Sequence, residues 1–168
     1  ERRRGDDTRA RLLDAVEALI ADHGFKPLTH RTIASRADAH VALLNYHFGS
    51  KEQLIEEALA RRASQLLALQ HEALAALRSR GDWTVEDVLW AYGGPFSSLN
   101  DEAPSPWRNY LCLVARLAGH DPSDTILMRH FGSVHRECLL ALRHALPAAD
   151  EAALTAGFRN CRLLLEHD

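Results

Sequence analysis

Two short helical patterns separated by a tight turn constrain the fold of this chain more than any other feature. The first begins at Thr29, whose hydroxyl can cap a helix, and carries Ile33 and Ala34 on its apolar side. The second covers about residues 41–47 and is stopped by Gly49. Two such helices behind a longer helix form a helix-turn-helix, so we predict that unit near the N-terminus.

Helical patterns also fill the rest of the chain. Apolar residues recur with a helical period over residues 8–23, and Gly24 stands where a left-handed C-terminal residue belongs. A capping box of Ser50 and Gln53 opens a long helix that we expect to reach residue 80. Further helices are expected from a cap at Thr84, over residues 107–118, over residues 121–146 and from residue 150 onwards. No segment alternates as a strand does, so the predicted fold class is all-α.

Two segments interrupt these patterns. Gly93-Gly94-Pro95 is expected to break or kink the helix that follows Thr84. Residues 100–106, with the sequence NDEAPSP, are the clearest loop. The predicted organisation is a three-helix head over residues 1–50 and a helical body over residues 51–168. The long helix joins them, so we do not expect a flexible linker.

The charge of the chain is small overall but unevenly placed. A net charge of −3 argues against a protein that binds polyanions over its whole surface. Between residues 25 and 51, however, Asp38 is the only acidic residue, and the basic residues there are Lys26, Arg31, Arg36 and Lys51. This segment is either a local basic surface or an ordinary solvated face.

The cysteines and the apolar runs bear on the compartment. Cys112, Cys138 and Cys161 are odd in number and far apart, which suits a reducing environment better than a disulfide framework. No apolar run approaches the length that spans a bilayer, and the N-terminus has no signal-peptide pattern. We expect a cytoplasmic protein with no membrane partner.

The second short helix carries side chains that suit DNA. Val41 and Ala42 can approach a thymine methyl group, and Asn45 can hydrogen-bond a base edge, adenine best. Tyr46 and His47 can reach phosphate oxygens. We therefore predict that this helix reads a DNA sequence.

Residues that flank this helix suit the phosphate backbone. The helix start at Thr29 offers N–H groups and the positive end of the dipole, and Lys51 offers a charge at the next helix start. Arg31, in the basic segment, and His40, just before the reading helix, complete the candidate contacts. Residues 2–4, three arginines, are either a disordered tail or an arm that enters a DNA groove.

Each of these residues also has a purely structural reading. We expect Ile33, Leu44 and Phe48 to lie in the core rather than on the interface. Tyr46 could be a packing residue, and Asn45 could be an ordinary polar residue near a helix end.

Residues 8–59 resemble the TetR family of transcriptional regulators. The residues that carry the resemblance are Thr29, Ile33-Ala34, Ala37, Leu44-Asn45-Tyr46-His47-Phe48-Gly49-Ser50-Lys51-Glu52 and Leu54. The resemblance implies an all-helical homodimer, DNA reading by the helix over residues 41–47 and a ligand pocket in the body. The NYHFGSKE stretch, the pattern of residues 107–117 and the late ALRHALPAAD segment look like a subgroup that answers to fatty acids or their coenzyme A esters.

The sequence departs from the family pattern at two positions. Asp38 stands where the turn glycine is usual, and aspartate tolerates positive φ better than most residues. His40 stands where a serine commonly caps the reading helix, and histidine caps poorly. His40 could instead contact a phosphate itself. Both changes leave the fold prediction in place, but the family pattern no longer indicates the operator sequence.

The body contains aromatic residues around the Gly-Gly-Pro segment. A broken helix leaves room and unpaired backbone groups, so these residues could line a pocket, although core packing is the simpler interpretation of each. Arg116 could bind a ligand carboxylate or pair with an acidic neighbour. The candidate ligand-binding residues are Trp90, Phe96, Trp107, Tyr110, Arg116 and Leu117.

The last two helices carry wide apolar faces, which predict a homodimer. Paired across a twofold axis, they would form a four-helix bundle. The residues expected to take part are Leu139, Leu140, Leu142, Leu146, Leu154, Phe158, Leu164 and Leu165.

Motifs for catalysis and metal binding are weak. His130 and His135 are five residues apart, whereas two ligands of one metal on a helix stand three or four apart. The sequence has no Gly-rich phosphate loop and no nucleophile elbow. We expect no enzyme, no metal and no cofactor.

The function predicted is that of a ligand-responsive repressor that binds a palindromic DNA operator as a dimer and answers to a small apolar or acyl effector. A helical protein-interaction adaptor that uses the same head surface, or a small α-helical enzyme, is the alternative. Salt separates them, because DNA binding falls steeply with salt.

Overall fold

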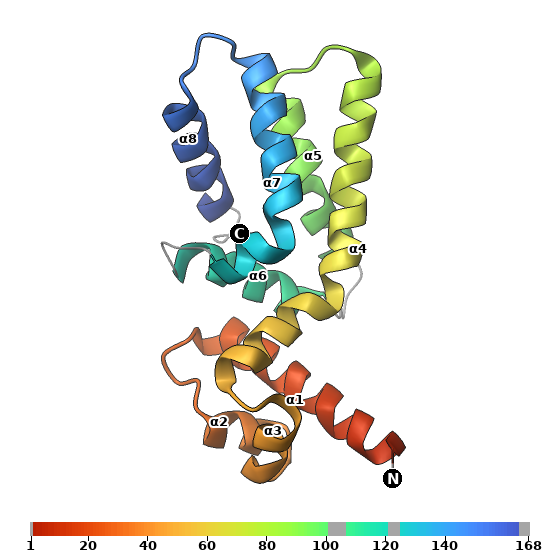
Figure 1. Cartoon of the computed structure of the whole chain (residues 1–168), viewed down its shortest axis with the longest axis vertical. Coiled ribbons are helices and arrows are strands. Elements are labelled where there is room, and N and C mark those ends of the chain that lie inside the picture. The colour runs from red at the N-terminus through yellow and green to blue at the C-terminus, as the bar shows by residue number, and fades with distance from the viewer. Residues whose placement is uncertain (1, 101–106, 121–124, 165–168) are drawn as a thin grey trace. The chain divides into compact units, whose positions relative to one another are not determined.

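The computed structural model describes residues 2–100, 107–120 and 125–164, and these residues form α-helices and no strand (Figure 1). This confirms the all-α prediction. The helices are α1 Arg2–His23, α2 His30–Arg36, α3 Val41–Phe48, α4 Lys51–Arg80, α5 Val85–Asn100, α6 Arg108–His120, α7 Thr125–Ala145 and α8 Glu151–Leu164.

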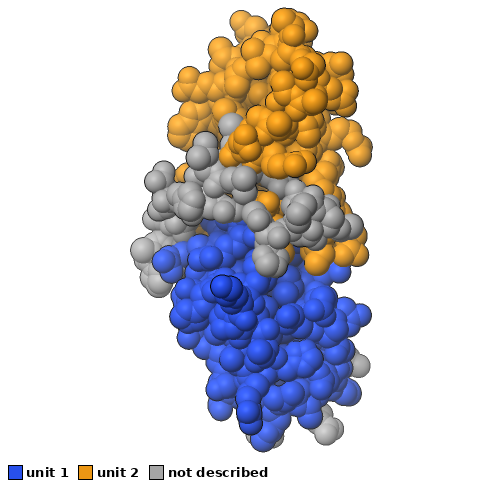
Figure 2. All heavy atoms as spheres, turned by 90° about the vertical axis from the view of Figure 1, so that its left-hand side faces the viewer, with its two compact units in different colours: residues 1–62, 108–116 blue, residues 63–107, 117–168 orange. Residues whose placement is uncertain are grey.

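These helices form two compact units, coloured separately in Figure 2. Unit 1 consists of residues Glu1–Arg62 and Arg108–Arg116, and unit 2 of residues Ala63–Trp107 and Leu117–Asp168. Both α4 and α6 contribute residues to each unit. The division of the chain into domains at residue 50 stays a prediction.

The caps in unit 1 follow the sequence. The Thr29 hydroxyl accepts a hydrogen bond from the Thr32 backbone N–H at 3.1 Å, and the Thr29 N–H donates to the Thr32 hydroxyl at 2.9 Å. This reciprocal cap starts α2. His40 at the start of α3 makes no side-chain cap, as its chemistry predicts. Gly49 ends α3 with a φ of +70°.

The turn between α2 and α3 confirms what was expected of Asp38. This residue has a φ of +48°, in the left-handed region that glycine adopts freely. Its carbonyl accepts a hydrogen bond from the Arg11 guanidinium at 3.2 Å. The following residue, Ala39, donates its N–H to the Ala34 carbonyl at 2.9 Å. The turn therefore keeps its shape without a glycine.

The core of unit 1 fixes the orientation of the two short helices. Ile33 on α2 and Leu44 on α3 are fully buried, and Phe48 is nearly so. All three were predicted as core residues, and this is confirmed. Apolar residues of α1 and α4 in the same unit are buried as well: Leu12, Val16, Ile20, Leu54 and Leu59. The opposite faces of α2 and α3 must therefore point outwards.

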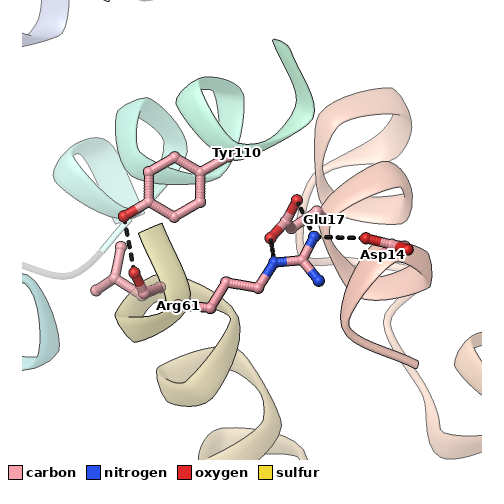
Figure 3. Close-up of polar contacts among 5 residues, drawn as sticks. Asp14, Glu17, Arg61 and Tyr110 are labelled. Carbon is pink, nitrogen blue, oxygen red and sulfur yellow. Dashed lines mark hydrogen bonds and ion pairs between the residues drawn. The ribbon is translucent and has the colours of Figure 1, made fainter. Parts of the chain in front are cut away.

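A charged network joins α1 to α4 within unit 1 (Figure 3). Arg61 pairs with Glu17, with an Nε–Oε1 distance of 2.9 Å, and also with Asp14. The Glu17 side chain is only 2% exposed, and burial raises the pKa of its carboxyl, an effect that the charge of Arg61 partly opposes. The sequence patterns do not predict this buried carboxylate.

The first part of α6 also belongs to unit 1. The Tyr110 hydroxyl donates to the Leu59 carbonyl at 2.7 Å, and the Tyr110 side chain is fully buried (Figure 3). Arg116 donates to the Ala21 carbonyl in the last turn of α1 at 3.2 Å. These two contacts attach α6 to α4 and to the C-terminal end of α1.

Unit 2 corrects one expectation about α5. A break or a kink was expected at Gly93-Gly94-Pro95; the break is absent, because α5 runs from Val85 to Asn100 with Pro95 inside it. Tertiary packing overrides the local preference, since Ala91, Tyr92 and Pro95 are all buried. Of the expected loop over residues 100–106, Asn100 is the last residue of α5, and the rest lies outside the described residues.

Other helix boundaries differ from the predicted ones. The first helix begins at Arg2 rather than at residue 8, so the backbone of residues 2–4 is helical, and the expectation of a disordered tail was wrong. The expected helix start at residues 121–123 lies outside the described residues, and α7 is described from Thr125. Within unit 2, α7 packs against both α5 and α8.

Candidate nucleic-acid interface

Helix α3 turns one narrow face outwards. The exposed residues stand one helical turn apart in two pairs, Val41 with Asn45 and Ala42 with Tyr46. Leu44, on the other side of the helix, is buried. Tyr46 is 82% exposed, which excludes the reading of this ring as a packing residue. The exposed face thus combines two small apolar side chains with an amide and a phenol.

The chemistry of this face suits a groove of duplex DNA. Asn45 offers both a donor and an acceptor, which matches the edge of adenine. The His47 ring is half-buried and lies 5.2 Å from the Tyr46 ring, edge to face. Both rings stand at the C-terminal end of α3, next to Asn45, and are candidates for contacts to backbone phosphates.

The flanking candidates are accessible but differ in how free they are. Arg31 on α2 and His40 before α3 are exposed, and Lys51 is half-buried at the first position of α4. Thr29 is exposed, but its hydroxyl is engaged in the cap of α2. Its backbone N–H is engaged in the same cap, so Thr29 starts the helix but keeps no free donor of its own for a phosphate.

Acidic residues border this face. An open hollow of about 510 Å³ beside the end of α3 is lined by Asn45, Tyr46, His47, Phe48, Gly49, Gln53, Glu56 and Glu57. Arg9 on α1 forms an ion pair with Glu57, and its guanidinium carbon lies 5.4 Å from the centre of the Phe48 ring. Arg9 thereby reduces the negative charge next to α3. Only the fold brings these distant residues together.

The six candidate ligand residues fall into both units. Trp90, Phe96, Trp107 and Leu117 belong to unit 2, and among them Trp90 is 65% exposed while Trp107 and Leu117 are buried. Tyr110 and Arg116 belong to unit 1, where each donates to a backbone carbonyl. The structure therefore gives these last two residues an anchoring contact of their own.

Groups for covalent or metal chemistry are sparse. Burial raises the pKa of the Cys138 thiol to about 12, so this cysteine is a poor nucleophile at neutral pH. Within the described ranges, no three His, Cys, Asp or Glu side chains gather as a metal site. None of the helices described there is both long and apolar enough to cross a membrane.

A helix-turn-helix that buries Leu44 and Phe48 and exposes Asn45 and Tyr46 defines a DNA-binding protein of the regulator class. Comparison with known proteins gives the family. A profile of "Bacterial regulatory proteins, tetR family" matches residues 12–58, and one of "Tetracyclin repressor-like, C-terminal domain" matches residues 90–162. The chain belongs to the TetR family of transcriptional regulators.

One relative matches along most of the chain and another over about a third of it. The HTH-type transcriptional regulator BetI of Agrobacterium fabrum is 39% identical over 150 residues, which are 89% of this chain and 70% of that protein. The HTH-type transcriptional repressor KstR of Rhodococcus jostii is 38% identical over 60 residues, 36% of this chain and 28% of that protein. The relatives and the family are transcriptional regulators rather than enzymes.

Solved structures share the fold. A TetR family transcription regulator from Marinobacter aquaeolei aligns with a TM-score of 0.58 at 24% identity, over 99% of this chain and 85% of its own. At this identity the likeness concerns the fold alone.

Proposed function

We propose that this regulator is a ligand-responsive repressor that binds a palindromic operator as a homodimer. The observation that carries the proposal is the exposed face of α3, where Asn45 and Tyr46 stand free of the core. A repressor among the relatives, KstR, supports the direction of regulation. A cytoplasmic location is part of the same proposal, since the DNA is there.

The experiment that tests DNA binding is selection of bound duplexes from a random pool. A dimer with two reading helices should select a palindrome whose half-sites lie about 34–36 Å apart, or a multiple of that distance. Binding to the selected duplex should weaken steeply with salt, because contacts to phosphates release counterions. A protein-interaction adaptor with the same head would select no sequence, and its DNA binding would be absent.

The homodimer is proposed to form through α7 and α8. Leu140 on α7 is 61% exposed, and Leu146, which directly follows the last residue of that helix, is 42% exposed, so both are free to contact a second copy. Leu142, Leu154 and Phe158 are buried within unit 2 and are therefore not free to take part. Leu165 lies outside the described residues. We expect Leu140→Arg to shift the protein from dimer to monomer in sedimentation at micromolar concentration, whereas a wild-type monomer would contradict the proposal.

The effector is proposed to be a small, mostly apolar or acyl compound that binds in unit 2. Phe96, Trp107 and Leu117 supply apolar lining from that unit, and the exposed Trp90 is the candidate at its surface. Coupling between effector and operator is usually about 1–3 kcal/mol, which would change DNA affinity roughly five- to 150-fold. Repeating the duplex selection with acyl compounds present tests this. If none of them changes DNA affinity, the acyl part of the proposal fails and DNA binding stands.

A further inference from the structure

Gln70 is a fully buried polar residue in unit 2. It lies on α4, and its side-chain amide nitrogen donates to the Tyr92 carbonyl on α5 at 2.9 Å. A carbonyl can only accept a hydrogen bond, so this contact fixes which end of the amide faces α5. The amide oxygen of Gln70 must point the other way.

The nitrogen of Gln70 has a structural explanation. Pro95 has no N–H and cannot continue the backbone ladder, and its ring crowds the preceding turn of α5. The carbonyl that loses its helical donor is that of Ala91, four residues before the proline. Gln70 donates to the next carbonyl, that of Tyr92, and so adds a hydrogen bond to the turn of α5 that precedes Pro95.

The oxygen of Gln70 has no such explanation. It is buried and accepts no hydrogen bond from any residue in the described part of the chain. A buried acceptor left without a donor is costly, and native proteins keep few of them. If the residue served α5 alone, half of its amide would be a burden to the fold.

The surroundings determine what could reach this oxygen. Leu66 and Leu74 on α4, one turn on either side of Gln70, are buried. The side chain of Tyr92, whose carbonyl Gln70 contacts, packs its ring at 5.0 Å from Phe158 and 5.9 Å from Phe96, and His135, at 5.0 Å from Phe158, is the polar ring in this cluster. A molecule in this environment has to be mainly apolar. At the amide oxygen it has to offer a donor, because a carboxylate would place acceptor against acceptor.

We propose that Gln70 is a specificity-determining residue of the effector site, whose amide oxygen accepts a hydrogen bond from a hydroxyl or amide N–H of an otherwise apolar effector. The inference rests on the proposed function, which places the effector in unit 2. It narrows the acyl class to compounds with a donor, such as hydroxylated or amide-linked chains, over unsubstituted carboxylates.

A matched pair of probes tests the proposal on the whole chain. 1-Decanol carries a hydroxyl donor, and decyl methyl ether has the same chain without one. Wild-type protein should bind decanol about tenfold more tightly than the ether, as measured by calorimetry. Gln70→Met keeps the volume and removes the acceptor, so this preference should disappear. Gln70→Met also loses the contact to Tyr92, so a readout on wild-type protein is added: the carbon-13 resonance of the Gln70 amide carbonyl should shift with decanol and not with the ether.

The outcomes separate this inference from the proposed function. Equal binding of the two probes, an unchanged preference in Gln70→Met, no decanol binding, or no shift of the Gln70 resonance with decanol would each overturn the role of Gln70. If decanol binds through Gln70 but DNA affinity stays the same, ligand response fails and the Gln70 site stands. If a compound without a donor controls DNA binding equally in wild type and Gln70→Met, the role of Gln70 fails and the ligand response stands.

Discussion

Replacing Arg61 by methionine tests whether the ion pair to Glu17 holds unit 1 together. Methionine keeps most of the volume of the side chain but removes the charge, and Glu17, 2% exposed, loses the partner 2.9 Å away. A buried carboxylate left unpaired in this way typically costs about 3–5 kcal/mol. The carboxyl can instead take up a proton, and the free energy of that protonation is an upper limit on the loss of stability.

The limit depends on pH in a definite direction. The ordinary pKa of the Glu17 carboxyl is 4.5. Protonating such a group at pH 7 therefore costs about 3.4 kcal/mol, and at pH 5 only about 0.7 kcal/mol. We expect Arg61→Met to lose about 3 kcal/mol of unfolding free energy at pH 7 and about 1–2 kcal/mol at pH 5, where the neutral acid still lacks hydrogen-bond partners.

In the wild-type protein, the contribution of Glu17 to stability should also decrease as pH rises, but by a smaller amount. Burial raises the pKa of Glu17 in the folded state above its unfolded value, so the folded state binds more protons between the two values. Stability from this group is therefore fully present below pH 4.5 and is lost as pH rises through the folded pKa. The Glu17→Gln variant should lack this component.

Urea unfolding at pH 5 and pH 7 measures these values, and the double variant Glu17→Met with Arg61→Met is the control. It removes both charges, so it should regain most of the stability that Arg61→Met loses at pH 7. A loss that is the same at both pH values, or a double variant as unstable as the single one, would refute the reasoning.

Two further changes in unit 1 have expected outcomes. Asp38→Gly relieves the strain of a left-handed φ of +48°, but glycine also has more freedom in the unfolded chain. The net gain in unfolding free energy, measured by thermal unfolding, should therefore be small, about 0.5 kcal/mol. A loss above about 1 kcal/mol would mean that the aspartate side chain stabilises the turn. Tyr110→Phe removes the hydroxyl that donates to Leu59 and should cost about 1 kcal/mol in urea unfolding, whereas an unchanged midpoint would show that this contact is dispensable.

Local patterns in the sequence were sufficient for most of the fold. The Thr29 cap, the positive φ at Asp38 and the stop at Gly49 depend on neighbours within a few residues, and each is present as expected. The predicted long helix over residues 51–80 coincides with α4. The predicted break at Pro95 is absent, because long-range packing outweighs the local cost of a proline in a helix.

The candidate site was predictable to the extent that it lies on one short helix. The alternation of Leu44 and Phe48 with Asn45 and Tyr46 specifies which face of α3 is free, and the structure agrees. The ion pair of Arg9 with Glu57 joins residues far apart in the chain, so no spacing rule could indicate it. The same is true of the contacts that attach Tyr110 and Arg116 to unit 1.

The central claim is that the outward face of α3 reads a DNA sequence. The most direct test compares the affinity of wild type, Asn45→Ala and Asn160→Ala for a selected duplex and for a scrambled one. Asn160 is an exposed asparagine on α8, so its replacement is the same chemical change outside the interface. Asn45→Ala should lose about 1–3 kcal/mol of preference for the selected duplex, with thermal stability nearly unchanged, and Asn160→Ala should lose none. Equal preference in wild type and Asn45→Ala would contradict the assignment of α3 as the reading helix.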